Sequence, residues 1–172
     1  MGYLEKKTVY LAGPITAVSD DGIGWRKLIT PKLRELGVIV DDPTVMTVGN
    51  LGEVADHKAM FKQLAKERKF AQLKEVFFPI VRKDLRCVDK ADFFIFYYDP
   101  DVPMFGGIHE LVVAHWQRKP ILMFCEDDKV ERINPWVLTF IKAGDLYTNW
   151  DELFKHLKDV DNHVFNTSYW TL

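Results

Sequence analysis

Three acidic residues stand out because their surroundings differ from those of ordinary surface carboxylates. Asp84 occupies a helical stretch close to an apolar stripe, Asp101 follows the most apolar segment of the chain, and Glu110 comes just after Gly106 and Gly107. A pair of carboxylates can divide the tasks of nucleophile and proton donor. Each one alone is a weak signal, because loop carboxylates are usually solvated and a glutamate in a first helical turn complements the helix dipole.

Glycines at two places could bring a ligand close to the backbone. Gly13-Pro14 ends the apolar run that begins at Tyr10, and Gly106-Gly107 precede a helix expected from about residue 108 to 117. Glycine permits such close approach, although a tight turn explains Gly13 equally well. Asn134, directly before a proline, is either a helix N-cap or a ligand-binding residue.

Several common chemistries have no motif in this chain. The sequence contains no Walker A motif, no G-x-G-x-x-G, no H-E-x-x-H, no C-x-x-C and no G-x-S-x-G. Zinc sites, dinucleotide binding and serine hydrolysis therefore have no support. We expect His109 on a helix surface, because neighbouring residues on a helix do not face each other. No metal or organic cofactor is expected.

Composition narrows the class of protein further. The 172 residues carry a formal charge of −2, which argues against a dedicated nucleic-acid binder. The apolar runs are far shorter than the roughly 18 residues of a membrane helix, and no signal segment opens the chain. The two cysteines, Cys87 and Cys125, lie in apolar stretches and cannot form a disulfide framework. We therefore expect a reduced cytoplasmic protein that binds neither membranes nor nucleic acids.

Short apolar runs alternate with helical periodicity along the chain. Strands are expected at residues 8–12, 38–40, 92–98 and 120–125. Helices are expected at 25–36, at 53–89 with an interruption near Pro79, at 108–117, from Pro135 and from about Trp150. This alternation predicts an α/β fold with a parallel sheet covered on both faces, in one domain spanning residues 1–172. Ligands of such sheets bind at the carboxyl ends of the strands.

Taken together, these features resemble the nucleoside 2-deoxyribosyltransferase family, within a wider superfamily that includes nucleoside 5′-monophosphate N-glycosidases. The resemblance extends from about residue 6 to 158 and is carried by Lys6–Pro14, Asp84-Leu85 with Lys90–Asp92, Asp99–Asp101 with Gly107–Leu111, Ile133-Asn134 and Tyr147–Phe154. It implies a flavodoxin-like, doubly wound sheet of five parallel strands. It also implies homo-oligomers, either dimers or hexamers.

The resemblance assigns roles to individual residues. Glu110 matches the nucleophilic glutamate, while Asp84 and Asp101 match acidic residues that contact the nucleobase and assist its departure. Tyr10 matches a tyrosine close to the nucleophile, and Asn134 matches an asparagine that reaches the sugar hydroxyl in a neighbouring subunit. The expected substrate-binding residues are completed by Gly13, Pro14, Trp25, Gly106 and Gly107.

The implied activity is transfer of 2-deoxyribose between nucleobases through a covalent ester on Glu110. The substrates would be a deoxynucleoside and a free nucleobase, and Asp101, with Asp84, would supply a proton from a carboxyl group of raised pKa. One alternative is a nucleoside 5′-monophosphate N-glycosidase, whose phosphate would need donors such as Ser19, Trp25-Arg26 and the glycine pair. Another is a non-catalytic nucleotide-binding module on the same fold.

Two segments lie outside the quoted motifs. Residues 41–80 form a helical and loop segment that matches nothing in the family pattern, and we expect it to cover the base pocket. The tail, residues 159–172, ends in an aromatic stretch with little charge. Because disordered tails are poorer in aromatic residues, we expect it to pack on this subunit or on a neighbour.

Overall fold

The most apolar segment of the chain forms the middle strand of a parallel sheet. The computed structural model describes residues 2–15, 17–45, 57–164 and 170. Strand β3 (Phe93–Tyr97), with the sequence FFIFY, is buried at all but its last residue. It pairs in parallel with β1 (Thr8–Ala12), where Val9 lies opposite Phe93. The sheet has five parallel strands in the order β2-β1-β3-β4-β5, which is the flavodoxin-like order. The predicted fold class is thus confirmed.

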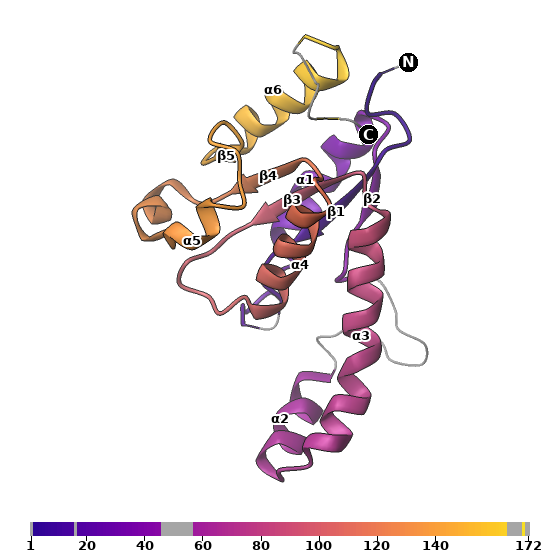
Figure 1. The fold of residues 1–172 in the computed structure, drawn as a ribbon, viewed down its shortest axis with the longest axis vertical. Helices are drawn as coiled ribbons and strands as arrows, with labels where there is room; N and C mark the ends of the chain where they lie inside the picture. Colours follow the sequence, from indigo (N-terminus) through magenta and orange to yellow (C-terminus); the bar gives the residue numbers. More distant parts are fainter. Residues whose placement is uncertain (1, 16, 46–56, 165–169, 171–172) are drawn as a thin grey trace.

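The remaining elements follow the expected alternation closely (Figure 1). In chain order they are α1 (Ile23–Glu35), β2 (Ile39–Asp41), α2 (Lys58–Lys66), α3 (Phe70–Lys90), α4 (Phe105–Trp116), β4 (Ile121–Phe124), the 3-10 helix η2 (Asp127–Arg132), α5 (Pro135–Leu138), β5 (Leu146–Tyr147) and α6 (Trp150–Asp161). Asn134 and Asn149 cap α5 and α6, each accepting a hydrogen bond from the backbone two residues on. Asparagine is a preferred residue at both positions.

Alternation along β1 divides the core into two layers. Val9 and Leu11 pack in a cluster with side chains of α1 and α6, whereas Tyr10 and Ala12 pack in a second cluster with α3 and α4. Successive side chains of a strand point to opposite faces, so a doubly covered strand is apolar on both. Tyr10 therefore points toward the same face of the sheet as α4.

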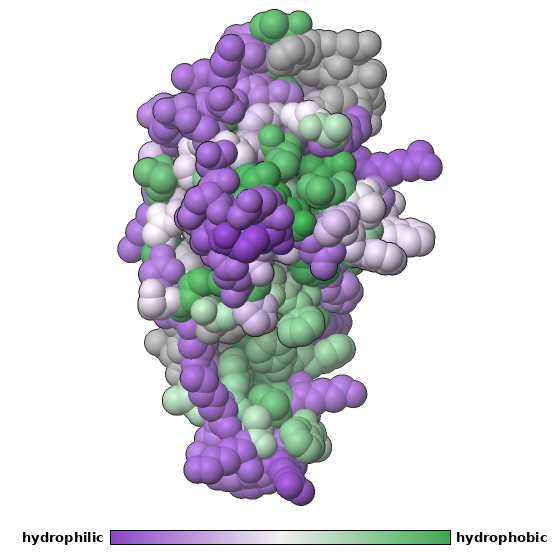
Figure 2. Space-filling model, turned by 90° about the vertical axis from the view of Figure 1, so that its left-hand side faces the viewer, coloured by the Kyte–Doolittle hydropathy of each residue, from purple (hydrophilic) through white to green (hydrophobic). Residues whose placement is uncertain are grey.

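Helix α3 is continuous, which corrects the expected interruption near Pro79. A proline inside a helix removes one backbone hydrogen bond, but packing holds both halves of this one in place. The second half packs on the sheet through Val88, and its Ile80 is also buried. The first half projects past the sheet beside α2 (Figure 1). There the ring of Phe77 meets that of Phe61 edge to face, with ring centroids 5.2 Å apart. Figure 2 shows apolar side chains over this projecting part of the molecule.

The glycine pair lies inside a helix instead of preceding it. Helix α4 begins at Phe105, so Gly106 and Gly107 form its first turn, three residues earlier than the expected start. Gly107 packs closely, because a Cβ atom there would lie 3.3 Å from a ring carbon of Phe96. The missing side chain lets the start of α4 approach β3.

The end of the chain returns to the core. Trp170 is 1% exposed and packs against Phe93 with ring centroids 5.3 Å apart. Its carbonyl oxygen accepts a hydrogen bond from the Tyr3 hydroxyl. For this residue the expected packing of the tail on its own subunit is confirmed, while residues 165–169, 171 and 172 lie outside the described part. Among the described residues, no helix combines the length and apolar character needed to span a membrane.

Candidate active site

A pocket of about 420 Å³ opens at the carboxyl ends of β1 and β3. In the strand order 2-1-3-4-5 this is the topological switch point, where ligands of such folds bind. Most of the predicted site residues line it, namely Gly13, Pro14, Asp84, Gly106, Gly107 and Glu110. The structure thus gathers residues from three distant parts of the sequence into one cavity.

Glu110 is held by a tyrosine from the neighbouring strand. It lies in the second turn of α4, is only partly exposed, and its Oε1 accepts a hydrogen bond of 3.1 Å from the Tyr10 hydroxyl. Tyr10 is itself fully buried. One carboxylate oxygen is thereby oriented by Tyr10, which leaves Oε2 for a reacting atom in the pocket.

Burial changes the acidity of both groups. The pKa of Glu110 is raised to about 8, first by burial and then by the negative charge of Asp84, against the opposing effects of Tyr10, Arg26 and Lys83. Burial and the Glu110 carboxylate raise the pKa of Tyr10 well above its ordinary value. The tyrosine hydroxyl therefore stays protonated and acts as a hydrogen-bond donor.

Asp84 lies on α3 among apolar neighbours, as the sequence indicates. Ile80, Val81 and Leu85 line the pocket beside it. Burial raises the pKa of Asp84, although the nearby Lys83 ammonium opposes this effect. Its buried Oδ1 has that ammonium, 3.5 Å away, as an ion-pair partner, and it has no closer hydrogen-bond donor among the described residues. A ligand could complete the hydrogen bonding of this carboxyl group.

Asp101 does not join the two other carboxylates in the described lining of the pocket. Its side chain is 53% exposed and forms a two-pronged ion pair with Arg132 of η2, with Arg132 Nη2 donating to Oδ2 at 3.0 Å and Nε donating to Oδ1 at 3.2 Å. Next to it, Asp99 accepts a hydrogen bond of 2.8 Å from Lys129. These pairs fasten the loop after β3 to η2. The structure thus does not place Asp101, which was expected to supply a proton together with Asp84, in the described lining beside Glu110, whereas Asp84 is in that lining and raises the pKa of Glu110.

Trp25 belongs to the core and not to the described lining of the pocket. It is 9% exposed and stacks on Trp150 with ring centroids 6.0 Å apart. A Cβ atom on Gly13 would lie 2.8 Å from Trp25 Cζ2, closer than carbon atoms pack. The structure therefore does not place Trp25, a predicted substrate contact, in the described lining: it supports the pocket wall from behind, and glycine is required in front of it.

Asn134 also lies away from the described lining of this pocket. Its Oδ1 accepts a hydrogen bond of 2.9 Å from Trp136 N, and the residue is exposed. The N-cap interpretation is confirmed, and the contact of Asn134 with a sugar stays a prediction.

Residues from α3 complete the pocket wall. Phe77 and Ile80 line it, as does Pro43, so parts of the segment 41–80 contribute to the pocket wall, and their covering of a base stays a prediction. Residues 46–56 lie outside the described part. His109 is exposed, as expected for a helix surface, but it also lines the pocket beside Glu110. Helix geometry alone did not predict this position, because a wide pocket spans more than one side of a helical turn.

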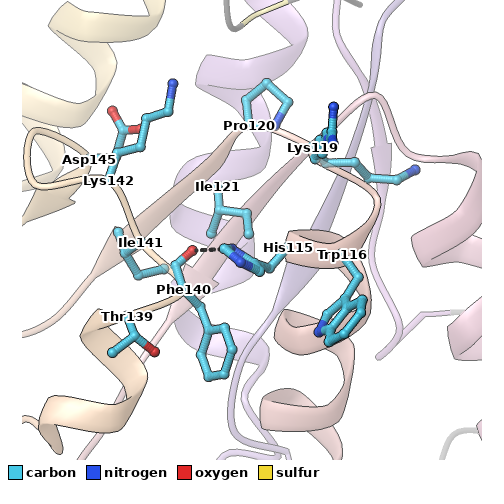
Figure 3. Close-up of a pocket in the computed structure, with 11 residues that line it drawn as sticks. His115, Trp116, Lys119, Pro120, Ile121, Thr139, Phe140, Ile141, Lys142 and Asp145 are labelled. Carbon is cyan, nitrogen blue, oxygen red and sulfur yellow. Dashed lines mark hydrogen bonds between the residues drawn. The ribbon is translucent and has the colours of Figure 1, made fainter.

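A larger hollow of about 830 Å³ lies at the opposite edge of the sheet (Figure 3). It surrounds the start of β4, and His115 there contacts the carbonyl oxygen of Phe140 at 3.1 Å. This is the amino end of the strand, where ligands of parallel sheets seldom bind. Among the residues that the structure describes, no group of three or more His, Cys, Asp or Glu side chains could hold a metal ion.

Known structures share this fold. A 2-deoxyribosyltransferase from the psychrotolerant bacterium Bacillus psychrosaccharolyticus has a TM-score of 0.57 and 18% identity, covering 86% of this chain and 90% of that one. A conserved protein from Enterococcus faecalis V583 has a TM-score of 0.61 and 17% identity, covering 90% and 98%. The CMP N-glycosidase BcmB of Clostridium botulinum, at 16% identity and coverage of 88% and 99%, has a TM-score of 0.43, too low to define a shared fold.

No protein-family model and no curated protein matches this sequence. At these identities the similarity to the first two structures establishes the architecture alone: the chain shares its fold with a 2-deoxyribosyltransferase.

The raised pKa of Glu110 predicts a pH-dependent change in stability. Because the folded protein favours the protonated carboxyl group, this contribution is fully present below pH 4.5 and is lost as the pH rises toward 8. Between pH 5 and pH 9 we expect Glu110→Gln to gain roughly 2–4 kcal/mol in unfolding free energy relative to wild type. Urea denaturation of both proteins at pH 5 and at pH 9 measures this difference in unfolding free energy. Glu75→Gln, at an exposed position on α3, is the control, and an equal change in both variants would contradict the prediction.

The contact between Gly13 and Trp25 predicts a steric effect. Gly13→Ala should destabilise the protein by roughly 1–3 kcal/mol, because Trp25 is buried and cannot move aside. Gly106→Ala is the matched control, since a Cβ atom there meets nothing within 4 Å, and a helical alanine should stabilise by roughly 0.5–1 kcal/mol. Chemical denaturation compares the two. Equal stability of the Gly13 variant and wild type would show that the wall is not rigid.

Proposed function

We propose that this protein is a nucleoside 2-deoxyribosyltransferase, which moves 2-deoxyribose from one nucleobase to another. The observation that carries the proposal is the pairing of Glu110 with Tyr10 in a pocket that also presents Asp84. The fold shared with a 2-deoxyribosyltransferase supports it. The remaining lining is mostly apolar, which suits a nucleobase and a deoxysugar.

In the proposed reaction Glu110 Oε2 attacks C1′ of the sugar. The bond from C1′ to the base nitrogen breaks, and its electron pair stays on the base, which takes a proton from the Asp84 carboxyl group. The products are a deoxyribosyl ester of Glu110, a neutral free base and an ionised Asp84. A second base then attacks C1′ and gives its N–H proton to Asp84. The ester bond between C1′ and Glu110 Oε2 breaks, and its electron pair returns to the Glu110 carboxylate. Two inversions retain the configuration.

The acidities of the two carboxyl groups suit this exchange of one proton. Two buried carboxyl groups close together disfavour double ionisation, so the pair retains a proton near neutral pH. With a pKa of about 8, Glu110 is ionised in about one molecule in ten at pH 7. Activity should therefore require the proton to lie on Asp84, next to the leaving base, while Glu110 is the anion beneath the developing positive charge.

The charged residues of the pocket support the proposal of a nucleoside substrate over its 5′-monophosphate. Arg26 is the one arginine or lysine in the described lining, and all five of its N–H donors already point to backbone carbonyl oxygens. Ser19, another candidate phosphate donor, is exposed and absent from that lining. The N-glycosidase alternative thus lacks an available cation at the described site.

An exchange assay tests the function. Deoxyinosine and adenine should yield deoxyadenosine with wild-type protein, whereas Glu110→Gln should give no detectable transfer. Asp84→Asn should lose about 10²–10⁴-fold. With a deoxyriboside whose leaving group needs no proton, Asp84→Asn should regain near wild-type rates and Glu110→Gln should stay inactive.

Other outcomes of that assay would contradict the proposal. Release of base from a 5′-monophosphate, unaffected by added free base, would identify an N-glycosidase. Binding of a nucleotide by calorimetry without any turnover would identify a non-catalytic module. Full activity of Glu110→Gln would exclude the covalent mechanism.

We further propose that the protein acts as a homo-oligomer in which Asn134 reaches a neighbouring subunit's substrate. Asn134 is exposed, and its amide NH₂ group remains available because only Oδ1 is used in capping α5. Beside it Trp136 and Leu138 are 72% and 41% exposed, as apolar side chains at subunit interfaces often are in the isolated chain.

Mixing two inactive variants tests this shared site. After Glu110→Gln and Asn134→Ala chains are refolded together, mixed dimers contain one intact site each, so about a quarter of wild-type activity should return. Each variant alone should remain inactive with an unchanged oligomer size by light scattering. A monomeric protein, or mixed dimers without activity, would refute the proposal.

A further inference from the structure

Arg26 is a fully buried arginine at the base of the candidate active site. It lies in the first turn of α1 and is 0% exposed, yet it lines the pocket together with Glu110. Its charge is partly balanced by Asp42, with Nε and Oδ1 3.5 Å apart. A buried guanidinium carries a large desolvation cost, so its neighbours must use its charge and its donors.

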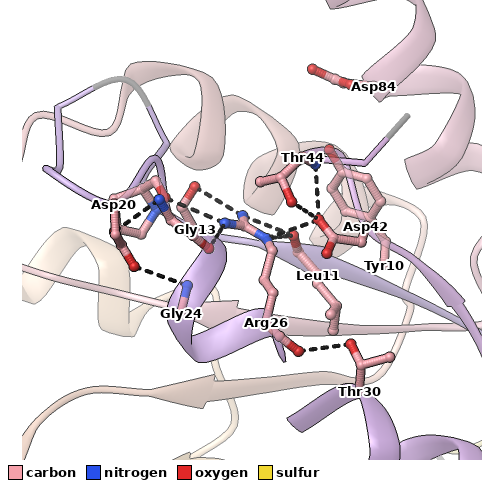
Figure 4. A network of polar contacts seen from close by, with 12 residues as sticks. Tyr10, Leu11, Gly13, Asp20, Gly24, Arg26, Thr30, Asp42, Thr44 and Asp84 are labelled. Atoms are coloured by element: carbon pink, nitrogen blue, oxygen red, sulfur yellow. Dashed lines mark hydrogen bonds and ion pairs between the residues drawn. The ribbon is translucent and has the colours of Figure 1, made fainter. Parts of the chain in front are cut away.

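The guanidinium joins the ends of two strands and the start of a helix (Figure 4). Nε and Nη2 donate to the Leu11 carbonyl oxygen at 3.3 and 3.1 Å, and Nη2 also donates to Gly13 O at 3.3 Å. Nη1 donates to Gly22 O at 2.7 Å and to Pro14 O at 3.4 Å. The Gly13-Pro14 wall is therefore attached to α1 through this one side chain.

Asp42 extends the same network to the strand beside β1. Its Oδ1 accepts hydrogen bonds from the backbone N and the hydroxyl of Thr44, at 2.8 and 2.7 Å. Pro43, between these two residues, lines the pocket. Gly22 makes the closed arrangement possible, because it has a φ of 70° and a Cβ atom there would overlap Pro14 O and Arg26 Nη1.

Arg26 also acts electrostatically on the two acidic groups. The charged and titratable groups around Glu110 come from four elements: Tyr10 on β1, Arg26 on α1, Asp84 and Lys83 on α3, and His109 on α4 itself. Of the two cations that lower the pKa of Glu110, Arg26 has the larger effect, and it lowers that of Asp84 as well. Its positive charge favours one anion in the carboxyl pair.

We infer that Arg26 is a positioning residue with two separable actions: its fork of donors fixes the Gly13-Pro14 wall, and its charge sustains an ionised carboxylate in the pocket. The first action bears on substrate binding and rests on the proposed function. The second concerns the ionisation of Glu110 and does not depend on which substrate is used.

Substitutions of Arg26 and Asp42 separate the two actions. Arg26→Lys keeps a positive charge but loses the planar fork. Arg26→Met loses both, and Asp42→Asn removes the balancing negative charge while keeping the fork. Each is made with and without Glu110→Gln, and the difference in stability across pH 5 to 10 gives the pH at which Glu110 ionises, without any activity measurement.

The expected shifts have opposite signs. Arg26→Met should raise the pH midpoint of Glu110 ionisation by about one unit or more, Asp42→Asn should lower it, and Arg26→Lys should leave it close to that of wild type. In the exchange assay Arg26→Lys should raise KM about tenfold with kcat changed less than threefold, because binding geometry is lost while the charge remains.

Identical midpoints in all variants would overturn the charge role, and an unchanged KM in Arg26→Lys would overturn the positioning role. If Arg26→Met does not fold, the comparison of Asp42→Asn with wild type still decides whether the charge of Arg26 acts on Glu110. Absence of exchange activity in wild type would refute the proposed function but leave the ionisation measurement interpretable.

Discussion

The arrangement of the site depends on a carboxyl group that is withdrawn from water next to another one. Glu110 and Asp84 come from different helices, and burial raises the pKa of both. Such a pair is unfavourable for folding unless other groups stabilise the anionic state. Tyr10 donates a hydrogen bond to Glu110, and Arg26 and Lys83 contribute positive charge. The pair therefore favours one proton and one anion held close together, and under the proposed function this arrangement would serve acid-assisted substitution at a glycosidic carbon.

The order of the strands accounts for the position of the pocket. In a 2-1-3-4-5 sheet, β1 and β3 send their following segments to opposite faces, so a space opens where they diverge. Tyr10, on the face of β1 that meets α4, reaches Glu110 across this space, while the chain after β1 turns away at Gly13 toward α1. Glu110, the Tyr10 hydroxyl that orients it and the buried cation Arg26 can thus meet although they belong to three separate segments.

Much of the fold and part of the site could be predicted from the sequence. Strands were identifiable because they are short, apolar and ended by Gly, Asp or Pro, and the glutamate, Asp84 and both glycine positions lie in one pocket as the motifs indicated. The exposed position of Asp101 could not be predicted, because the sequence shows that a carboxylate follows a strand but not that Arg132, 31 residues along the chain, is paired with it. For the same reason the sequence did not indicate that Trp25 packs against Trp150 or that α3 continues through Pro79. Packing partners decide whether an aromatic ring lies in the core and whether a helix continues past a proline. The role of Arg26 could not be predicted for the same reason. Its hydrogen-bond acceptors are the backbone carbonyl oxygens of four residues, Leu11, Gly13, Pro14 and Gly22, and such acceptors leave no signature in side-chain types.

Helix α3 has a mechanical consequence for the acid it carries. From Phe70 to Asp84 the helix spans roughly 20 Å, and its outer half is braced by α2 but not by the sheet. Because α3 is one continuous helix, a tilt of its outer half would also move the residues of the helix that line the pocket. Phe77 and Asp84 lie two turns apart on α3 and both line the pocket, so the width of the cavity and the position of the Asp84 carboxyl group would change together. A molecule that binds to α2 and the first half of α3 would therefore also change the position of Asp84 in the pocket.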